Sequence, residues 1–295
     1  MTKNQTHTIS NQKYQALVNQ AEDRTRGIRD LEDRSLATAV AVTLGERFFL
    51  ATAGHVVHKS HRLALITETG ELPLAEVKRD WRYDEKVDVA FVEVAREQAG
   101  AITASLGPND ILTDFDEKMQ HDALVLGFPT DAYVQIRQGL GCMSFICRSV
   151  TLPRAEWPRT WLLENGRAIK LSTKRDILAR YVDPKGEAVV RDRNTAVEVE
   201  NLRTAPPGPA GMSGCGIWLT CASEPKESGL WRPNMQLIGL QHAAMIQGRL
   251  LRGTRIGHWL DLVAQSYPEL AEHIKVAKRR ARTFWKNAVQ VRNQV

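Results

Sequence analysis

Short apolar runs rich in β-branched and aromatic residues alternate with turn-like breaks through most of the chain from residue 37 onwards. Runs of this length predict β-strands. Because no helical pattern separates them, they favour antiparallel barrels or a sandwich over a parallel α/β sheet. The expected strands are Thr38–Thr43, Phe48–Thr52, Leu63–Thr67, Val87–Val94, Ala123–Phe128, Ser144–Leu152, Gly216–Cys221 and Gln236–Leu240.

Both ends of the chain show a helical pattern instead. Across residues 11–33 the apolar side chains recur at the spacing of one helical face. After Gly257 the pattern turns helical again, is interrupted at Pro268, and ends in a basic segment. We therefore expect an N-terminal helical extension (1–34) and a basic C-terminal helix (263–295).

Two groups of strands lie between these ends. The polar stretch Ser105–Gln120 separates the groups and is typical of a linker. It divides a first unit, residues 35–118, from a second unit, residues 119–262. Within the second unit, the charged and proline-containing stretch from about 153 to 204 is interpreted as an insertion or a set of long loops.

Composition excludes several classes of protein. No apolar run approaches the roughly 20 residues that cross a membrane, and the polar N-terminus lacks the apolar core of a signal peptide. Four cysteines in 295 residues do not make a disulfide framework, so we expect a reduced, cytoplasmic protein with buried thiols. The cysteines are Cys142, Cys147, Cys215 and Cys221.

The net charge of +6 belongs to one segment. Residues 273–295 hold seven basic residues and no acid, and removing these seven from the 40 leaves 33 basic against 34 acidic residues. The body of the chain is therefore neutral, which makes nucleic-acid binding the weakest of the functional hypotheses. The basic tail, with Phe284 and Trp285, fits either a helix packed on the body or a contact with an acidic partner.

Three short motifs place chemically useful residues next to strands. His55 follows a strand and a small-residue turn, Asp88 stands at the head of an apolar strand, and Ser213 lies in a glycine-rich turn before another strand. A serine hydroxyl needs an adjacent base, usually histidine, and that histidine needs an acceptor on its other nitrogen. Glycines beside the serine allow backbone N–H groups to converge on an oxyanion.

In that chain order these residues resemble the chymotrypsin-fold (trypsin-like) serine peptidases, with a closer likeness to bacterial and intracellular members. The resemblance covers Ala37 to Leu262, with separations of 33 and 125 residues between its three chemical residues. It implies an all-β core of two antiparallel six-stranded β-barrels. The motifs that carry it are Thr52-Ala53-Gly54-His55, Asp88-Val89-Ala90, Gly211-Met212-Ser213-Gly214, Leu126-Gly127-Phe128-Pro129 and the strand Leu237–His242.

The resemblance also implies a role for each residue. His55 would be the general base, Asp88 its orienting acid and Ser213 the nucleophile, with no metal or organic cofactor. The backbone N–H groups of Gly211 and Ser213 would form the oxyanion hole. The strand that pairs with the substrate would contain Leu240, Gln241, His242 and Ala243.

The sequence departs from the family in three places. Met212 stands where activated secreted members carry an acid that pairs with a newly cut N-terminus, so activation by propeptide cleavage is disfavoured. Cys215 replaces a usual glycine after the serine. No acid lies between Asn201 and Ser213, which disfavours cleavage after Lys or Arg.

Some residues allow another interpretation. Asp84 is the rival acid to Asp88, and is expected to be solvated. His55, His58 and His61 recur at a spacing of three, but without a matching carboxylate ligand a zinc site is disfavoured. His242 fits equally a contact to a polar substrate side chain and a packed histidine in a barrel wall.

The leading hypothesis is a serine endopeptidase that cleaves protein or peptide substrates through an acyl-enzyme. The alternative is a catalytically silent or partner-activated domain that binds peptides or proteins through the same cleft. The terminal helices and the 153–204 insertion lie outside the family core, and are candidate docking sites for a regulatory protein.

Overall fold

A computed structural model describes most of the chain between residues 11 and 278. The described ranges are 11–60, 62–67, 70–74, 80–99, 102, 104–129, 133–136, 139–142, 145–163, 166–181, 210–220, 235–245 and 249–278. Several expectations fall on other residues and lie outside this description, namely those on His61, residues 182–209, Cys221, and the tail with Phe284 and Trp285.

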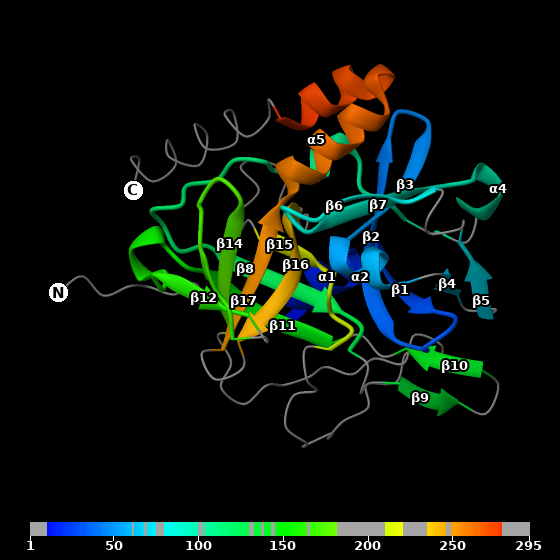
Figure 1. Ribbon diagram of the computed structural model, residues 1–295, viewed down its shortest axis with the longest axis horizontal. Coiled ribbons are helices and arrows are strands. Elements are labelled where there is room, and N and C mark those ends of the chain that lie inside the picture. Colours follow the sequence, from blue (N-terminus) through cyan, green and yellow to red (C-terminus); the bar gives the residue numbers. More distant parts are fainter. Residues whose placement is uncertain are drawn as a thin grey trace.

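The first half of the chain forms an antiparallel sheet of seven strands in the order β5-β4-β1-β2-β3-β7-β6 (Figure 1). We expected a six-stranded barrel here, whereas within the described residues this is a seven-stranded sheet with β5 and β6 at its two edges. The strands are β1 (Thr25–Asp30), β2 (Leu36–Leu44), β3 (Arg47–Thr52), β4 (Leu63–Thr67), β5 (Gly70–Pro73), β6 (Arg82–Asp84) and β7 (Val89–Val94).

The predicted helix over residues 11–33 is correct only for its first half. Helix α1 (Asn11–Glu22) ends before a turn, and β1 follows it. β1 pairs with β2 on one side and with β4 on the other, so it lies inside the sheet. Gly27 lowers helix propensity, and Ile28 is fully buried as a strand residue, because pairing on both sides outweighs the weak helical periodicity.

The second half forms a closed barrel of six strands, as expected. The order is β11-β14-β17-β16-β15-β8, and it places β16 in the barrel wall between β15 and β17. Two small ribbons, β9 (Tyr133–Ile136) with β10 (Gly139–Cys142) and β12 (Thr160–Leu162) with β13 (Ala168–Lys170), accompany the barrel. The barrel strands are β8 (Asp122–Gly127), β11 (Phe145–Thr151), β14 (Asp176–Tyr181), β15 (Gly216–Thr220), β16 (Met235–Met245) and β17 (Leu250–Arg255).

The interpretation of residues 153–204 as an insertion or a set of long loops is wrong for residues 176–181. After the short helix η3 (Arg154–Glu156) come the β12–β13 ribbon and then β14, which is a full barrel strand between β11 and β17. The charged residues of β14 concealed it, because Asp176 is buried in ion pairs with Arg175 and Arg252 rather than solvated.

The segment that links the two halves of the chain is partly buried. It contains helix η1 (Pro108–Asp110), and bridges tie Leu106 to Val42 and Ile111 to Leu237. Both Leu106 and Ile111 are almost fully buried. The linker therefore fixes the first sheet against the barrel.

One core joins both halves and both terminal helical segments. It includes Leu17 of α1, Phe49 of β3, Leu237 of β16 and Trp259 of α5 (Ile256–Ser266). Phe49 and Trp259 make an edge-on contact at 6.3 Å between ring centroids, where α5 lies against the sheet (Figure 1). Helices α1 and α5 are therefore structural parts of the folded body.

The C-terminal pattern is confirmed in its described part. Helix α5 ends before Pro268, which begins the short helix η4 (Pro268–Leu270), and residues 271–278 are helical. The short helices α2 (Gly54–Lys59) and α4 (Arg96–Ala99) complete the described elements.

Candidate active site

His55 is placed by the end of β3. The strand ends at Thr52, and α2 begins at Gly54 with Ala53 in an extended conformation before it. A Cβ at Gly54 would lie 3.2 Å from Asp88 Oδ1, so glycine permits the close approach of the turn that carries Asp88. The His55 imidazole is one-third exposed.

Asp88 lies in the tight turn between β6 and β7 with φ +56°, a left-handed conformation that Asp tolerates better than most residues. Its Oδ1 accepts a hydrogen bond of 2.7 Å from the backbone N–H of His55. Its Oδ2 lies 3.0 Å from His55 Nδ1 and 3.1 Å from Nδ1 of His242. Burial alone raises the pKa of Asp88, but the hydrogen bonds from His242 and His55 outweigh it and hold that pKa well below its usual range.

Ser213 lies in the turn before β15, between two glycines with positive φ, Gly211 (+89°) and Gly214 (+90°). Its Oγ lies 3.0 Å from His55 Nε2. The Gly214 N–H donates to the Gln241 carbonyl at 2.7 Å, which ties the turn to β16. His55 and Asp88 from the first half thus meet Ser213 from the second.

Thr38 of β2 links the turn that contains Ser213 to the first half of the chain through hydrogen bonds. The sequence analysis missed this role. The N–H of Thr38 donates to the Ser213 carbonyl at 2.9 Å, and its Oγ1 donates to the Gly211 carbonyl at 2.9 Å. The same Oγ1 accepts the N–H of Phe128 at 3.0 Å. A fully buried threonine inside a predicted strand gave no signal in the sequence that would distinguish it from core.

The serine turn contains the two predicted oxyanion donors, the backbone N–H groups of Gly211 and Ser213. Within the described part of the chain, no hydrogen bond occupies the N–H of Gly211 or of Ser213. The Met212 carbonyl, which shares a peptide plane with the Ser213 N–H, accepts a hydrogen bond of 3.0 Å from the Cys215 N–H, and this bond fixes the orientation of that plane. An oxyanion hole requires donors that are already oriented in this way.

The predicted substrate strand needs correction at three positions. Leu240 pairs with Gly216 on one side and Thr254 on the other, and the Gln241 N–H donates to the Cys215 carbonyl, so neither residue has a free strand edge. The His242 side chain is only 5% exposed and hydrogen-bonds Asp88, so it does not present its imidazole to a substrate.

Ala243 fits the prediction better. It is partly exposed and pairs with β17 through Arg252, and within the described residues no strand pairs with its other edge. Among the described residues, the edge of β16 opposite β17 is therefore paired at Leu240 and unpaired at Ala243.

The rival residues lie elsewhere. Asp84 accepts the N–H of Lys86 at 2.8 Å, and His58 pairs with Glu85 at 3.0 Å on the surface. Within the described ranges, no cluster of three His, Cys, Asp or Glu side chains could hold a metal ion. Cys215 is a free, fully buried thiol, and burial raises its pKa well above the usual value, so it is no rival nucleophile.

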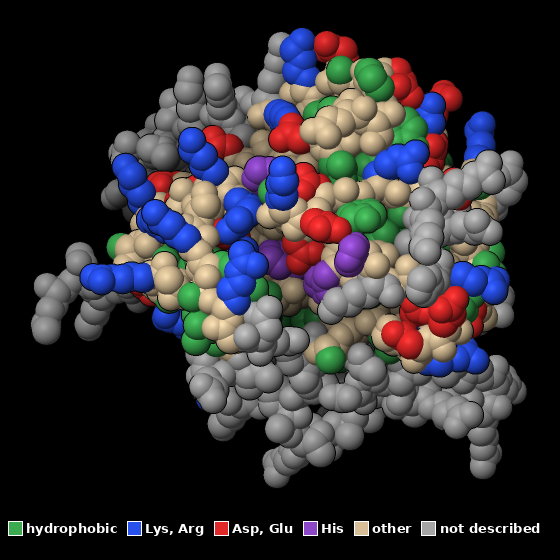
Figure 2. All heavy atoms as spheres, viewed as in Figure 1, with side chains coloured by type: hydrophobic (Ala, Val, Ile, Leu, Met, Phe, Trp, Pro, Cys, Tyr) green, Lys and Arg blue, Asp and Glu red, His purple; other side chains and the backbone are tan. Residues whose placement is uncertain are grey.

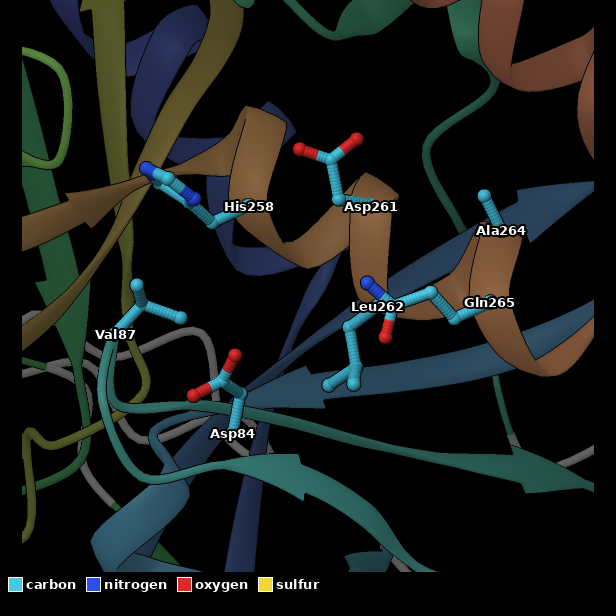
Figure 3. A pocket seen from close by; sticks show the side chains of 7 residues that line it. All are labelled: Asp84, Val87, His258, Asp261, Leu262, Ala264 and Gln265. Atoms are coloured by element: carbon cyan, nitrogen blue, oxygen red, sulfur yellow. The ribbon is translucent and has the colours of Figure 1, made fainter.

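Histidine and acidic side chains gather near the middle of one face of the molecule (Figure 2). Close to this region, a cavity of about 430 Å³ lies between the turn that precedes Asp88 and helix α5. Figure 3 shows Asp84 and Val87 on the turn, opposite His258, Asp261 and Leu262 of α5. The cavity is lined by neither His55 nor Ser213, so it is separate from the three-residue site that these two residues form with Asp88.

Replacing Gly214 with alanine is expected to lower the free energy of unfolding by at least about 3 kcal/mol. A Cβ there would lie 2.0 Å from Thr52 Oγ1 and 2.1 Å from the Thr38 carbonyl, and φ is +90°. Urea denaturation would measure the change. Gly166→Ala is the matched control, because Gly166 has φ +77° but no atom near its Cβ position. Equal losses in the two variants would contradict the expected clash.

Replacing Thr38 with valine is expected to lower the free energy of unfolding by about 2–4 kcal/mol, because it leaves the Gly211 carbonyl and the Phe128 N–H without their buried partner. Chemical denaturation would measure this. Thr43→Val, which removes a hydroxyl that pairs with Ser105, should cost less than about 1.5 kcal/mol. A Thr38 variant as stable as the Thr43 variant would show that the bonds from Thr38 do not hold the turn.

Structural comparison identifies chymotrypsin-fold proteases as neighbours of this chain. The scabies mite inactivated protease paralogue S-I1 matches with a TM-score of 0.51 at 12% identity, over 84% of this chain and 96% of that one. The Rv3671c protease from M. tuberculosis matches with a TM-score of 0.46 at 16% identity, over 84% and 82%. A serine endoprotease from Yersinia pestis matches with 0.43 at 11%, over 91% and 68%.

The match to the scabies mite paralogue, together with the closed barrel and the second antiparallel sheet, shows that the chain has the chymotrypsin-like fold. At these identities the likeness shows the fold and not the activity. No family model matches the sequence, and no curated protein matches it as a relative. Among the described helices, none is both long and apolar enough to span a membrane.

Proposed function

We propose that this protein is a serine endopeptidase that cleaves protein or peptide substrates through a Ser213–His55–Asp88 triad. The observation that carries the proposal is the continuous set of contacts from Ser213 Oγ to His55 Nε2 (3.0 Å) and from His55 Nδ1 to Asp88 Oδ2 (3.0 Å). A nucleophile, a base and an orienting acid in this geometry support acyl transfer as the reaction.

In the first step Ser213 Oγ attacks the scissile carbonyl carbon while His55 Nε2 takes the hydroxyl proton. Asp88 stabilises the resulting imidazolium and holds its Nδ1–H. The N–H groups of Gly211 and Ser213 would stabilise the oxyanion. Breakage of the C–N bond, with proton transfer from His55 to the leaving amine, gives an acyl-enzyme, and water activated by His55 then hydrolyses it.

The chemistry of the site also supports the finer parts of the proposal. An open strand edge at Ala243 would align an extended peptide beside Ser213. No step needs a metal or an organic cofactor, because the base and oxyanion donors come from the chain itself. The buried thiols of Cys147 and Cys215 support a reducing, cytoplasmic setting.

A fluorophosphonate probe tests the proposal directly, because it reacts with an activated serine beside an oxyanion hole. We expect the native protein to be labelled, and peptide mapping by mass spectrometry to place the adduct on Ser213. Heat-denatured protein is the control and should not react. Labelling at another residue, or none in the native protein, would refute the proposal and favour a silent domain that binds peptides.

A further inference from the structure

Asp88 is contacted by a second histidine besides His55. His242 Nδ1 lies 3.1 Å from Asp88 Oδ2, the same oxygen that lies 3.0 Å from His55 Nδ1. A single carboxylate thus accepts from two imidazoles and from the backbone N–H of His55. The two histidines come from different halves of the molecule, α2 and β16.

A bulge in β16 contains His242, the residue that contacts Asp88. The β16–β17 register shifts between Gln241, which pairs with Gly253, and Ala243, which pairs with Arg252, so His242 is the unpaired residue of a bulge. A β-bulge reorients the side chain that it contains. The neighbouring Gln241 accepts the N–H of Gly214 through its carbonyl, so adjacent residues of β16 hold the serine turn and the acid.

We propose that His242 is a positioning residue of the triad: its Nδ1–H holds the Asp88 carboxylate, and its ring has to stay neutral for Asp88 to support a protonated His55. This inference rests on the proposed function. His242 neither touches the reacting atoms nor exchanges a proton with Ser213, and it acts only through Asp88.

The surroundings of His242 favour the neutral ring. Its Nε2 is buried and has no hydrogen-bond partner among the residues that the structure describes, so a proton there would be left unsatisfied. A neutral ring that donates from Nδ1 needs no proton at Nε2.

Two of the three charged or titratable groups around the His242 ring also favour its neutral form. The three groups are Asp88, which favours protonation, and Arg252 of β17 and His55 of α2, which oppose it. Burial is the largest effect and lowers the pKa of His242 despite the bond to Asp88. A second imidazolium on Asp88 would repel the protonated His55 that forms during the reaction, and would share the carboxylate with it.

Two substitutions separate the hydrogen bond from the bulk of the ring. In His242→Asn the amide nitrogen takes the position of Nδ1 and keeps an N–H donor, whereas His242→Leu fills a similar volume without one. At about pH 8, where imidazoles are neutral, the fluorophosphonate labelling rate should fall about tenfold to a hundredfold in His242→Leu. His242→Asn should stay within about fivefold of the wild type. Equal rates in the two variants would overturn the positioning role.

The pH profile tests the neutrality of the ring. Below about pH 6, the wild type should lose reactivity more steeply than His242→Asn, because only the wild type has an imidazole at this position that can be protonated. Superimposable profiles would overturn this part of the proposal.

A third measurement does not depend on reactivity or on the stability of a variant. Two-bond ¹H–¹⁵N spectra of the wild-type full chain report histidine tautomers, and His242 should remain the neutral Nδ1–H form from about pH 8 down to about pH 6. An Nε2–H tautomer or a protonated ring in this range would overturn the proposal. If the wild type is not labelled, the proposed function fails, while these spectra still decide whether His242 donates to Asp88.

Discussion

Replacing Ser213 with alanine is expected to lower kcat by about a millionfold and to leave the fold intact. The effect is this large because the base, the acid and the oxyanion donors act on one oxygen atom, and none of them can attack a carbonyl in its place. Among the described residues, the partly exposed Ser213 side chain forms a hydrogen bond with His55 alone, so its loss should barely change the melting temperature. Turnover of the best substrate from a fluorogenic peptide library would measure the effect.

A second serine provides the control. Ser105 contacts Thr43 Oγ1 at 2.5 Å and lies outside the three-residue site, so Ser105→Ala should retain wild-type turnover. Binding of the peptide to Ser213→Ala should survive, because the strand edge at Ala243 is unchanged. If the Ser213 variant turned over substrate as fast as the Ser105 variant, another residue would be the nucleophile.

The β-strand pattern was the most predictable feature of the fold. Leu63–Thr67 forms β4 with the predicted bounds, and β2, β3, β8 and β15 begin or end within two residues of the prediction. These strands are apolar and well separated by turns, so local pattern and tertiary structure agree.

The errors fall where tertiary contacts outweigh the local pattern. β1 has helical spacing but becomes a strand because it completes pairs with β2 and β4. β14 is charged, yet it enters the barrel because Asp176 and Arg252 neutralise each other across neighbouring strands. Neither pairing can be deduced from one segment alone, since each partner lies far away in the sequence.

The three-residue site was found because its residues stand at strand ends in a recognisable order. The structure brings His55, Asp88 and Ser213 within hydrogen-bond distance, as the sequence suggested, while their catalytic roles stay a prediction. Thr38 and the orientation of His242 were missed. The first is one buried threonine in a strand, and the second depends on a bulge that periodicity does not reveal.

Replacing Asp88 with asparagine is expected to lower kcat/KM by about ten-thousandfold. Asparagine tolerates the left-handed φ of +56°, so the backbone of the turn should survive, unlike in an alanine variant. In the wild type, three N–H donors (the backbone N–H of His55 and the Nδ1–H groups of His55 and His242) share the two carboxylate oxygens of Asp88, whereas the carboxamide of asparagine offers them a single oxygen. The NH₂ group of the carboxamide also favours the wrong tautomer of His55. The rate of peptide turnover would measure the loss.

Asp84→Asn is the matched control for this variant, because Asp84 ends β6 just before the same turn and its side chain accepts only the Lys86 N–H among the bonds described. It should keep wild-type turnover, and a comparable loss in both variants would contradict the assignment of Asp88.

The stability of the Asp88→Asn variant gives an independent check. Because the folded pKa of Asp88 lies below its unfolded value of about 3.9, its charge stabilises the fold above that pH, and this stabilisation is lost as the pH falls through the folded pKa. Asp88→Asn should therefore be less stable than the wild type at neutral pH, and the difference should shrink in acid.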